Sequence, residues 1–196
     1  MFGDPVTQWC FTVVFLVLGL DSTIRMVIDR RRPLQSVGHG LHLAMSVVMM
    51  AMAWPWWSGL PSTPQVVFFT VAAGWFVLML LAQSLRRMPR WYAHGHNPWH
   101  LVMHVVMMLT MVWMVVSMSG MGPSAPGHDH SSLSLPIAIS GVMLTGGLIV
   151  AAMICLVDCM ENLRGDRRSG AEARASGAQT LMNLGMAAMC LPMLVV

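Results

Sequence analysis

The chain has no lysine and few charged residues of any kind. Charged residues make up 10% of its 196 residues, hydrophobic residues make up 56%, and the mean hydropathy is +0.66. Soluble domains normally carry about 25% charged residues, so the composition excludes an ordinary soluble domain. Basic stripes with interleaved aromatic residues are absent, which excludes nucleic acid as a partner. The composition predicts a multi-pass protein of the cell membrane, surrounded by the lipid bilayer.

Apolar stretches recur along the chain, and prolines stand at the breaks between them, where helices begin or end. Six of these stretches are long enough, at roughly 20 residues each, to cross a hydrocarbon core about 30 Å thick. We predict an all-α membrane protein with six transmembrane helices near residues 6–27, 35–54, 64–85, 98–119, 135–158 and 177–195. A charged linker is expected over 164–176.

The basic residues are eleven arginines, confined to three segments at 25–32, 86–90 and 164–174. The alternate connections near 55–63 and 120–134 contain none. Because positively charged loops stay on the cytoplasmic side, the three segments define a predicted inner face. Both termini are then expected on the outer side of the membrane.

One phrase occurs twice in the sequence. The pattern H-L-x-M-x-V-V-M-M covers 42–50 and again 100–108, each time at the inner end of a predicted span. A weaker third copy, QTLMNLGM at 179–186, carries Asn183 where the second copy has His104. Since a repeat unit defines the architecture, three copies indicate three similar structural units.

The predicted architecture is therefore a single transmembrane domain over residues 1–196, built from three pseudo-repeated helical hairpins. They cover approximately residues 5–54, 64–119 and 135–196. Each hairpin pairs an ordinary apolar helix with a methionine-rich one.

Methionine is abundant, with 22 residues, and most of them lie on the second, fourth and sixth spans. At about 100° per residue, most methionines of each span fall within an arc of roughly 80°. We call these sides of the helices the methionine faces. They comprise Met45, Met49 and Met52 in the second span, Met103, Met107, Met111, Met114 and Met118 in the fourth, and Met182, Met186, Met189 and Met193 in the sixth.

Any one of these methionines is explained by core packing, because methionine fills irregular gaps well. The faces as a whole are not, since membrane helix interfaces usually favour small residues and leucine would fill the same space. Soft thioether ligands select Cu(I) over harder cations. We therefore expect the methionine faces to point into the protein and to bind copper or another soft metal.

Methionine pairs four residues apart recur on these faces, among them Met45/Met49, Met103/Met107 and Met182/Met186. This spacing resembles the Met motif that lines the pore of trimeric copper transporters of the Ctr type, a likeness confined to the motif. The whole chain is similar to small, uncharacterised, Met/His-rich membrane proteins common in actinobacteria. That likeness supports the topology and implies no particular activity.

Histidines gather at the predicted inner ends of the spans. His42, His100 and His104 lie in first turns, and an ionisable group inside a span is a functional candidate by default. Neutral imidazole binds copper and zinc, so we predict a metal site here. If the two full copies of the phrase build it, the imidazole nitrogens of His42 and His100 lie within roughly 4–5 Å of each other.

Two further groups are candidate metal sites. Cys155 and Cys159, with Asp158 beside them, would form an inner exit site if their thiolates bind Cu(I). His128, His130 and Met121 lie in the predicted outer loop and would collect metal from outside.

Four functions are compatible with these features. Copper binding, transport or delivery is the first, and a non-catalytic accessory subunit of a larger membrane complex, such as a respiratory complex, is the second. A haem b electron-transfer protein would use His42 and His100 as haem ligands from two helices. A membrane zinc hydrolase would need Asp21 or Asp158 beside the histidines, although Asp21 is also spaced for an ion pair with Arg25. The sequence shows no nucleophile or base beyond this cluster, so an enzyme is disfavoured.

Overall fold

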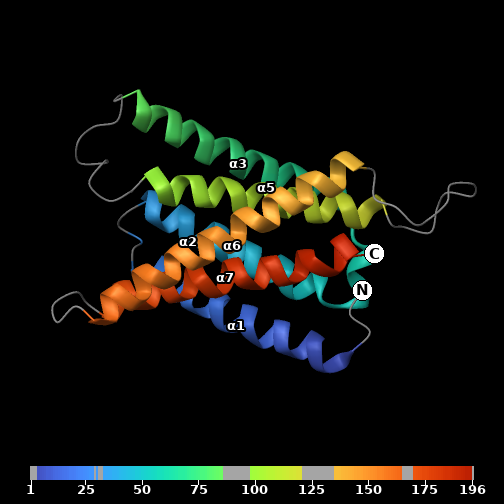
Figure 1. Cartoon of the computed structure of the whole chain (residues 1–196), viewed down its shortest axis with the longest axis horizontal. Helices are drawn as coiled ribbons and strands as arrows, with labels where there is room; N and C mark the ends of the chain where they lie inside the picture. The colour runs from blue at the N-terminus through green and yellow to red at the C-terminus, as the bar shows by residue number, and fades with distance from the viewer. Residues whose placement is uncertain are drawn as a thin grey trace, which may run out of the picture. The chain divides into compact units, whose positions relative to one another are not determined.

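The chain is helical throughout the part that the computed structural model describes, which is residues 4–28, 30, 33–85, 98–120, 135–164 and 170–195. Over these residues there are six α-helices, one short 3-10 helix and no strand. They are α1 (Pro5–Ile28), α2 (Pro33–Met52), η1 (Pro55–Gly59), α3 (Ser62–Ser84), α5 (Pro98–Gly120), α6 (Leu135–Arg164) and α7 (Gly170–Val195). Figure 1 labels the α-helices. The prediction of an all-α protein is confirmed for this part of the chain.

Prolines mark the starts of the helices, as predicted. Pro5, Pro33 and Pro98 are the first residues of α1, α2 and α5, where proline's missing N–H costs nothing and its fixed φ suits the helix. The linker predicted over 164–176 is too long, because α6 continues to Arg164 and α7 begins at Gly170. Glutamate, alanine and arginine dominate these helix ends, and all three are strong helix formers in water.

Four of the helices are long and apolar enough to cross a membrane. They are Pro5–Ile28, Ser62–Ser84, Trp99–Ser119 and Leu135–Arg164. In α2 the described apolar stretch, Ser36–Met52, is shorter, and α7 carries polar residues among its apolar ones. These two less apolar helices, α2 and α7, carry two of the three methionine faces. A membrane crossing by all six helices stays a prediction.

The helices group into two compact units. Unit 1 contains α1, α2, η1, the end of α6 from Cys155, and α7 as far as Met186. Unit 2 contains α3, α5, α6 as far as Ile154, and the end of α7 from Ala187.

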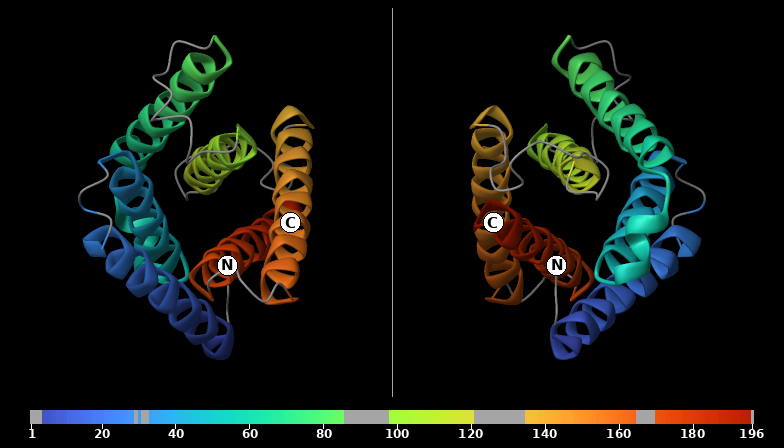
Figure 2. Two further views of the ribbon diagram at one scale, coloured as in Figure 1. Left: turned by 90° about the vertical axis from the view of Figure 1, so that its left-hand side faces the viewer. Right: turned by 90° about the vertical axis from the view of Figure 1, so that its right-hand side faces the viewer.

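In unit 1, α1 packs against both α2 and α7. The two helices α1 and α2 pack along each other (Figure 2). Gly19 of α1 faces Leu43 and Ser46 of α2, and a Cβ added there would lie 3.5 Å from an atom of each, in ordinary contact. The ring of Phe15, which is fully buried, lies against Gly185 of α7. At the other end of α2, the indole N–H of Trp54 donates a hydrogen bond to the Thr12 hydroxyl at 3.2 Å. These contacts fix α1 at two levels.

In unit 2, α3 packs along α5, and Phe69 and Phe76 of α3 are buried. On α5, Trp113 reaches toward α6, where its indole N–H donates to the Ile137 carbonyl at 2.9 Å. Gly141 of α6 lies directly beneath the same ring, and a Cβ added there would overlap it. The α5–α6 contact therefore depends on a glycine at this position.

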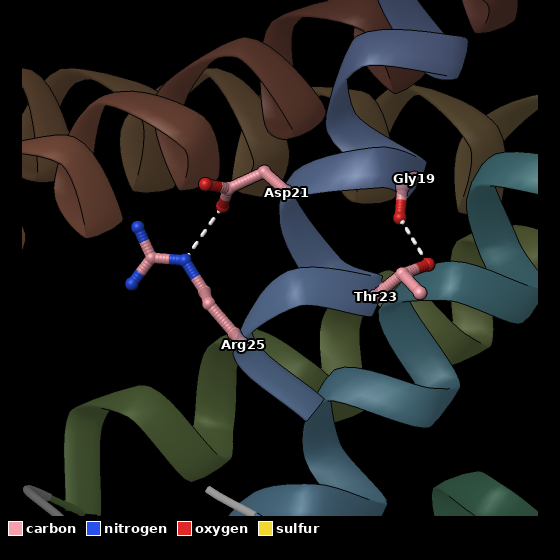
Figure 3. A network of polar contacts seen from close by, with 4 residues as sticks. All are labelled: Gly19, Asp21, Thr23 and Arg25. Atoms are coloured by element: carbon pink, nitrogen blue, oxygen red, sulfur yellow. Dashed lines mark hydrogen bonds and ion pairs between the residues drawn. The ribbon is translucent and has the colours of Figure 1, made fainter. Parts of the chain in front are cut away.

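The outward surface of α1 is apolar, which fits contact with lipid. Val13, Val17 and Leu20 are each more than half exposed. Toward the C-terminal end of α1, Asp21 and Arg25 form an ion pair, in which Arg25 Nε donates to an Asp21 carboxylate oxygen at 2.6 Å (Figure 3). The ion pair predicted from the spacing of four residues is confirmed, and it accounts for Asp21 without a catalytic role.

Candidate functional site

The methionine face of α5 lies inside the protein. Met103, Met107, Met111 and Met114 are each at most 2% exposed, and Met118 is half-buried. Met108, which the helical period places off the face, is fully buried as well. The buried thioether surface of α5 is therefore wider than the sequence predicted.

The faces of α2 and α7 are buried in the same way. No described methionine on them is more than 4% exposed, and this set contains Met45, Met49, Met52, Met182, Met186, Met189 and Met193. The prediction that the three faces are buried is confirmed, and the prediction that they face one common interior stays a prediction.

The described methionines of α6 are exposed. On α6, Met143, Met153 and Met160 are 73%, 57% and 46% exposed. The methionines of the faces and those of α6 thus differ clearly in burial. The α6 residues are matched controls for any experiment that replaces sulfur on the faces.

The buried side of α7 is also polar. Gln179, Thr180 and Asn183 are buried there, whereas Leu181 and Leu184 on the opposite side are about half exposed. A helix of a soluble protein has the reverse arrangement, with apolar residues inside. This polarity fits a helix that turns its leucines toward lipid and its polar groups toward the protein interior.

Most buried hydroxyls beside the methionines are bonded to their own helix. Ser46, Thr110 and Thr180 each donate to the carbonyl four residues earlier, at 2.8–2.9 Å. Asn183 differs, because neither its Oδ1 nor its Nδ2 has a hydrogen-bond partner among the described residues. A buried polar group without a partner is rare in proteins and requires a specific explanation.

The two histidines on α5 have different surroundings. The His104 ring lies 4.8 Å from the Phe76 ring, and its Nδ1 is 2.6 Å from the His100 carbonyl oxygen. Because a carbonyl can only accept, Nδ1 carries the proton and Nε2 is the nitrogen with metal-binding capacity in the neutral ring. His100 is exposed. Ligating histidines usually have this kind of anchor on the second nitrogen, so His104 is the better prepared ligand.

His42 is half-buried on α2 and belongs to unit 1, whereas His100 and His104 belong to unit 2. Its carbonyl accepts the Ser46 hydroxyl. The short distance expected between the His42 and His100 rings stays a prediction. Within the described ranges, no group of three His, Cys, Asp or Glu side chains is placed to hold a metal ion.

The remaining candidates are placed in part. Cys155 is buried, Asp158 is exposed, and the Cys159 thiol donates to the Ala173 carbonyl at 3.3 Å. Cys159 therefore joins α6 to α7 within unit 1, which is a packing role. The outer group of His128, His130 and Met121 lies outside the described residues.

The chemistry of the site is dominated by sulfur. Thioethers have no charge and do not ionise, so they bind soft, weakly hydrated cations such as Cu(I) and discriminate against Mg²⁺ and Ca²⁺. The sequence indicated these ligands through their helical period. It did not single out Asn183 as the unpaired polar group on the α7 face, although the repeat aligned that residue with His104.

A family model described as "Domain of unknown function (DUF5134)" matches residues 34–193, which include all three methionine faces. The chain belongs to the DUF5134 family. The match is not to a copper-transporter family, so the likeness to Ctr-type proteins remains one of motif.

Relatives of this DUF5134 protein occur in mycobacteria. The uncharacterized proteins Rv0970 of Mycobacterium tuberculosis and Mb0995 of Mycobacterium bovis are each 26% identical to it, over 99% of both chains. No solved structure matches. The comparisons agree with the predicted likeness to uncharacterised actinobacterial proteins and give no activity.

Proposed function

We propose that this DUF5134 protein is an integral membrane protein that crosses the bilayer six times with both termini outside. Four helices have the length and apolar character for this, and the 20 residues of α2 extend about 30 Å at 1.5 Å per residue. The arginine segments then all lie on the inner side, as charge asymmetry requires. Reporter fusions after Arg32, Arg90 and Arg168 should each report cytoplasm, and one external result would refute this topology.

We infer that the protein binds a soft metal cation, Cu(I) in the first place, and moves it along the buried methionine faces. The observation that supports this most is the selective burial of the face methionines beside the exposed methionines of α6. From Met103 to Met118 the face of α5 extends about 22 Å at 1.5 Å per residue, which is most of a hydrocarbon core. The faces thus offer thioether ligands at successive depths.

His104 is proposed as the inner ligand that accompanies the thioethers, because its Nδ1 is held by the helix backbone and its Nε2 has the lone pair. His100, four residues before His104 on the same helix, is proposed to share this site. A harder imidazole ligand at one end of a thioether path would hold the cation more tightly there than along the path.

The test uses substitutions that remove sulfur and keep volume. Met107→Leu with Met111→Leu removes two buried thioethers, and Met143→Leu with Met153→Leu removes two exposed ones as the control. Leucine and methionine exchange in cores at a cost usually below about 1.5 kcal/mol, so both double variants should fold.

Cu(I) affinity is measured by competition with a chromogenic chelator in detergent under reducing conditions. We expect the face variant to lose on the order of 100-fold or more, since even second-shell losses cost about 10- to 100-fold. The control should bind as the wild type does. Equal affinity of both variants, or no Cu(I) binding by the wild type, would refute the proposal and favour packing within an accessory subunit.

A further inference from the structure

The three copies of the repeated phrase place a polar residue at the same helical position. It is Ser46 in the first copy, His104 in the second and Asn183 in the third. Ser46 and His104 hydrogen-bond the carbonyl oxygen four residues earlier on their own helices. Asn183 makes no such bond, although it is the most polar of the three and is fully buried.

The surroundings of Asn183 on α7 do not satisfy its amide. The methionines nearest to it along α7 are Met182, the preceding residue, and Met186, which lies three residues on and on the same side of the helix. Their thioethers donate no hydrogen bond and accept only weakly. The nearby Thr180 hydroxyl is already bonded to the Ser176 carbonyl at 2.9 Å. The Asn183 amide thus presents one acceptor and two donor hydrogens to whatever lies beside it in the interior.

The ligand that fits must donate to Oδ1, accept from Nδ2 and be small. A bare Cu(I) ion cannot accept a hydrogen bond from the Asn183 Nδ2 hydrogens. It also prefers sulfur ligands to an amide oxygen. A side chain from another protein cannot reach the amide, because Asn183 is 0% exposed. Water has both a donor and an acceptor, and buried waters in proteins typically bind groups of this kind.

We propose that Asn183 binds water inside unit 1 and so forms a hydrated site close to the thioethers of α7. The inference deepens the proposed function and rests on it in one respect: a cation that moves along this face would meet water beside Met182 and Met186. The hydration itself does not require that a metal binds.

The test is X-ray radiolytic footprinting of the full chain in detergent, without added metal. Radiolysis converts bound water into hydroxyl radicals in place, and these oxidise adjacent methionines to the sulfoxide. Met107 is the internal control, because it is buried to the same degree as Met186 but belongs to unit 2. Oxidation at each methionine is followed by mass spectrometry in the wild type and in Asn183→Leu.

We expect Met182 and Met186 to be oxidised several-fold faster than Met107 in the wild type. In Asn183→Leu their rates should fall to that of Met107, because leucine binds no water. Equal rates at all three methionines in the wild type would overturn the proposal without any variant. Fast oxidation that persists in Asn183→Leu would also overturn it, since the water would then be held by other groups. Neither result depends on whether the protein binds Cu(I).

Discussion

Replacing Gly141 by alanine should destabilise unit 2, because the Trp113 ring occupies the space that a Cβ needs. The added carbon would overlap Cζ2 of that ring and lie 2.8 Å from both its Cε2 and Leu194 Cδ2. The ring has little freedom to move away, since Trp113 is buried and its N–H is bonded to the Ile137 carbonyl at 2.9 Å.

The magnitude follows from three contributions. Overpacking a buried site costs about 1–3 kcal/mol, and losing the indole hydrogen bond costs about 0.5–1.5 kcal/mol. Alanine stabilises the helix by up to about 1 kcal/mol relative to glycine, which offsets part of this loss. With the full ~1 kcal/mol subtracted, the free energy of unfolding of Gly141→Ala should fall by about 0.5–3.5 kcal/mol.

The control is Gly146→Ala on the same helix, where no atom lies within 4 Å of the added Cβ. This variant should be as stable as the wild type or more stable by up to about 1 kcal/mol. Unfolding is followed by circular dichroism during titration with a denaturing detergent. If Gly141→Ala is as stable as Gly146→Ala, the described contact between α5 and α6 is wrong.

Two further stability changes are expected from the Trp113 hydrogen bond and the Arg25–Asp21 ion pair. Trp113→Phe keeps most of the ring but loses the N–H donor to Ile137, so the unfolding free energy should fall by about 1 kcal/mol in the same titration; an unchanged value would mean that the bond is not formed. Arg25→Gln should destabilise by about 1 kcal/mol or more by leaving the half-buried Asp21 carboxylate unpaired. Adding Asp21→Asn should restore most of that loss, and strictly additive effects in this double-mutant cycle would argue against the ion pair.

The helices could be predicted closely from the sequence because prolines mark their starts and long apolar runs mark their lengths. The exception is the α6–α7 connection. A hydropathy pattern detects the apolar part of a helix and not its polar ends. It therefore predicts a linker near Arg164 and Gly170, where the structure has the polar ends of two helices. Helix propensity would have identified them.

The methionine faces could be predicted because burial follows the helical period, and a period is visible in one sequence. Other properties of the site depend on tertiary contacts that no period records. The buried position of Met108 and the donation from Cys159 to the Ala173 carbonyl are of this kind. Asn183 was visible in the repeat, but its lack of a partner became apparent only in the structure.

X-ray absorption at the copper edge of protein loaded with one equivalent of Cu(I) tests the central claim most directly, because it identifies the ligand atoms. If the methionine faces bind the cation, the first shell contains two or more sulfur atoms at about 2.3 Å, the distance known for zinc–sulfur bonds. Met107→Leu with Met111→Leu should reduce the number of these sulfur atoms, and Met143→Leu with Met153→Leu should not. A first shell of nitrogen or oxygen alone, at about 2.0 Å, would contradict the claim.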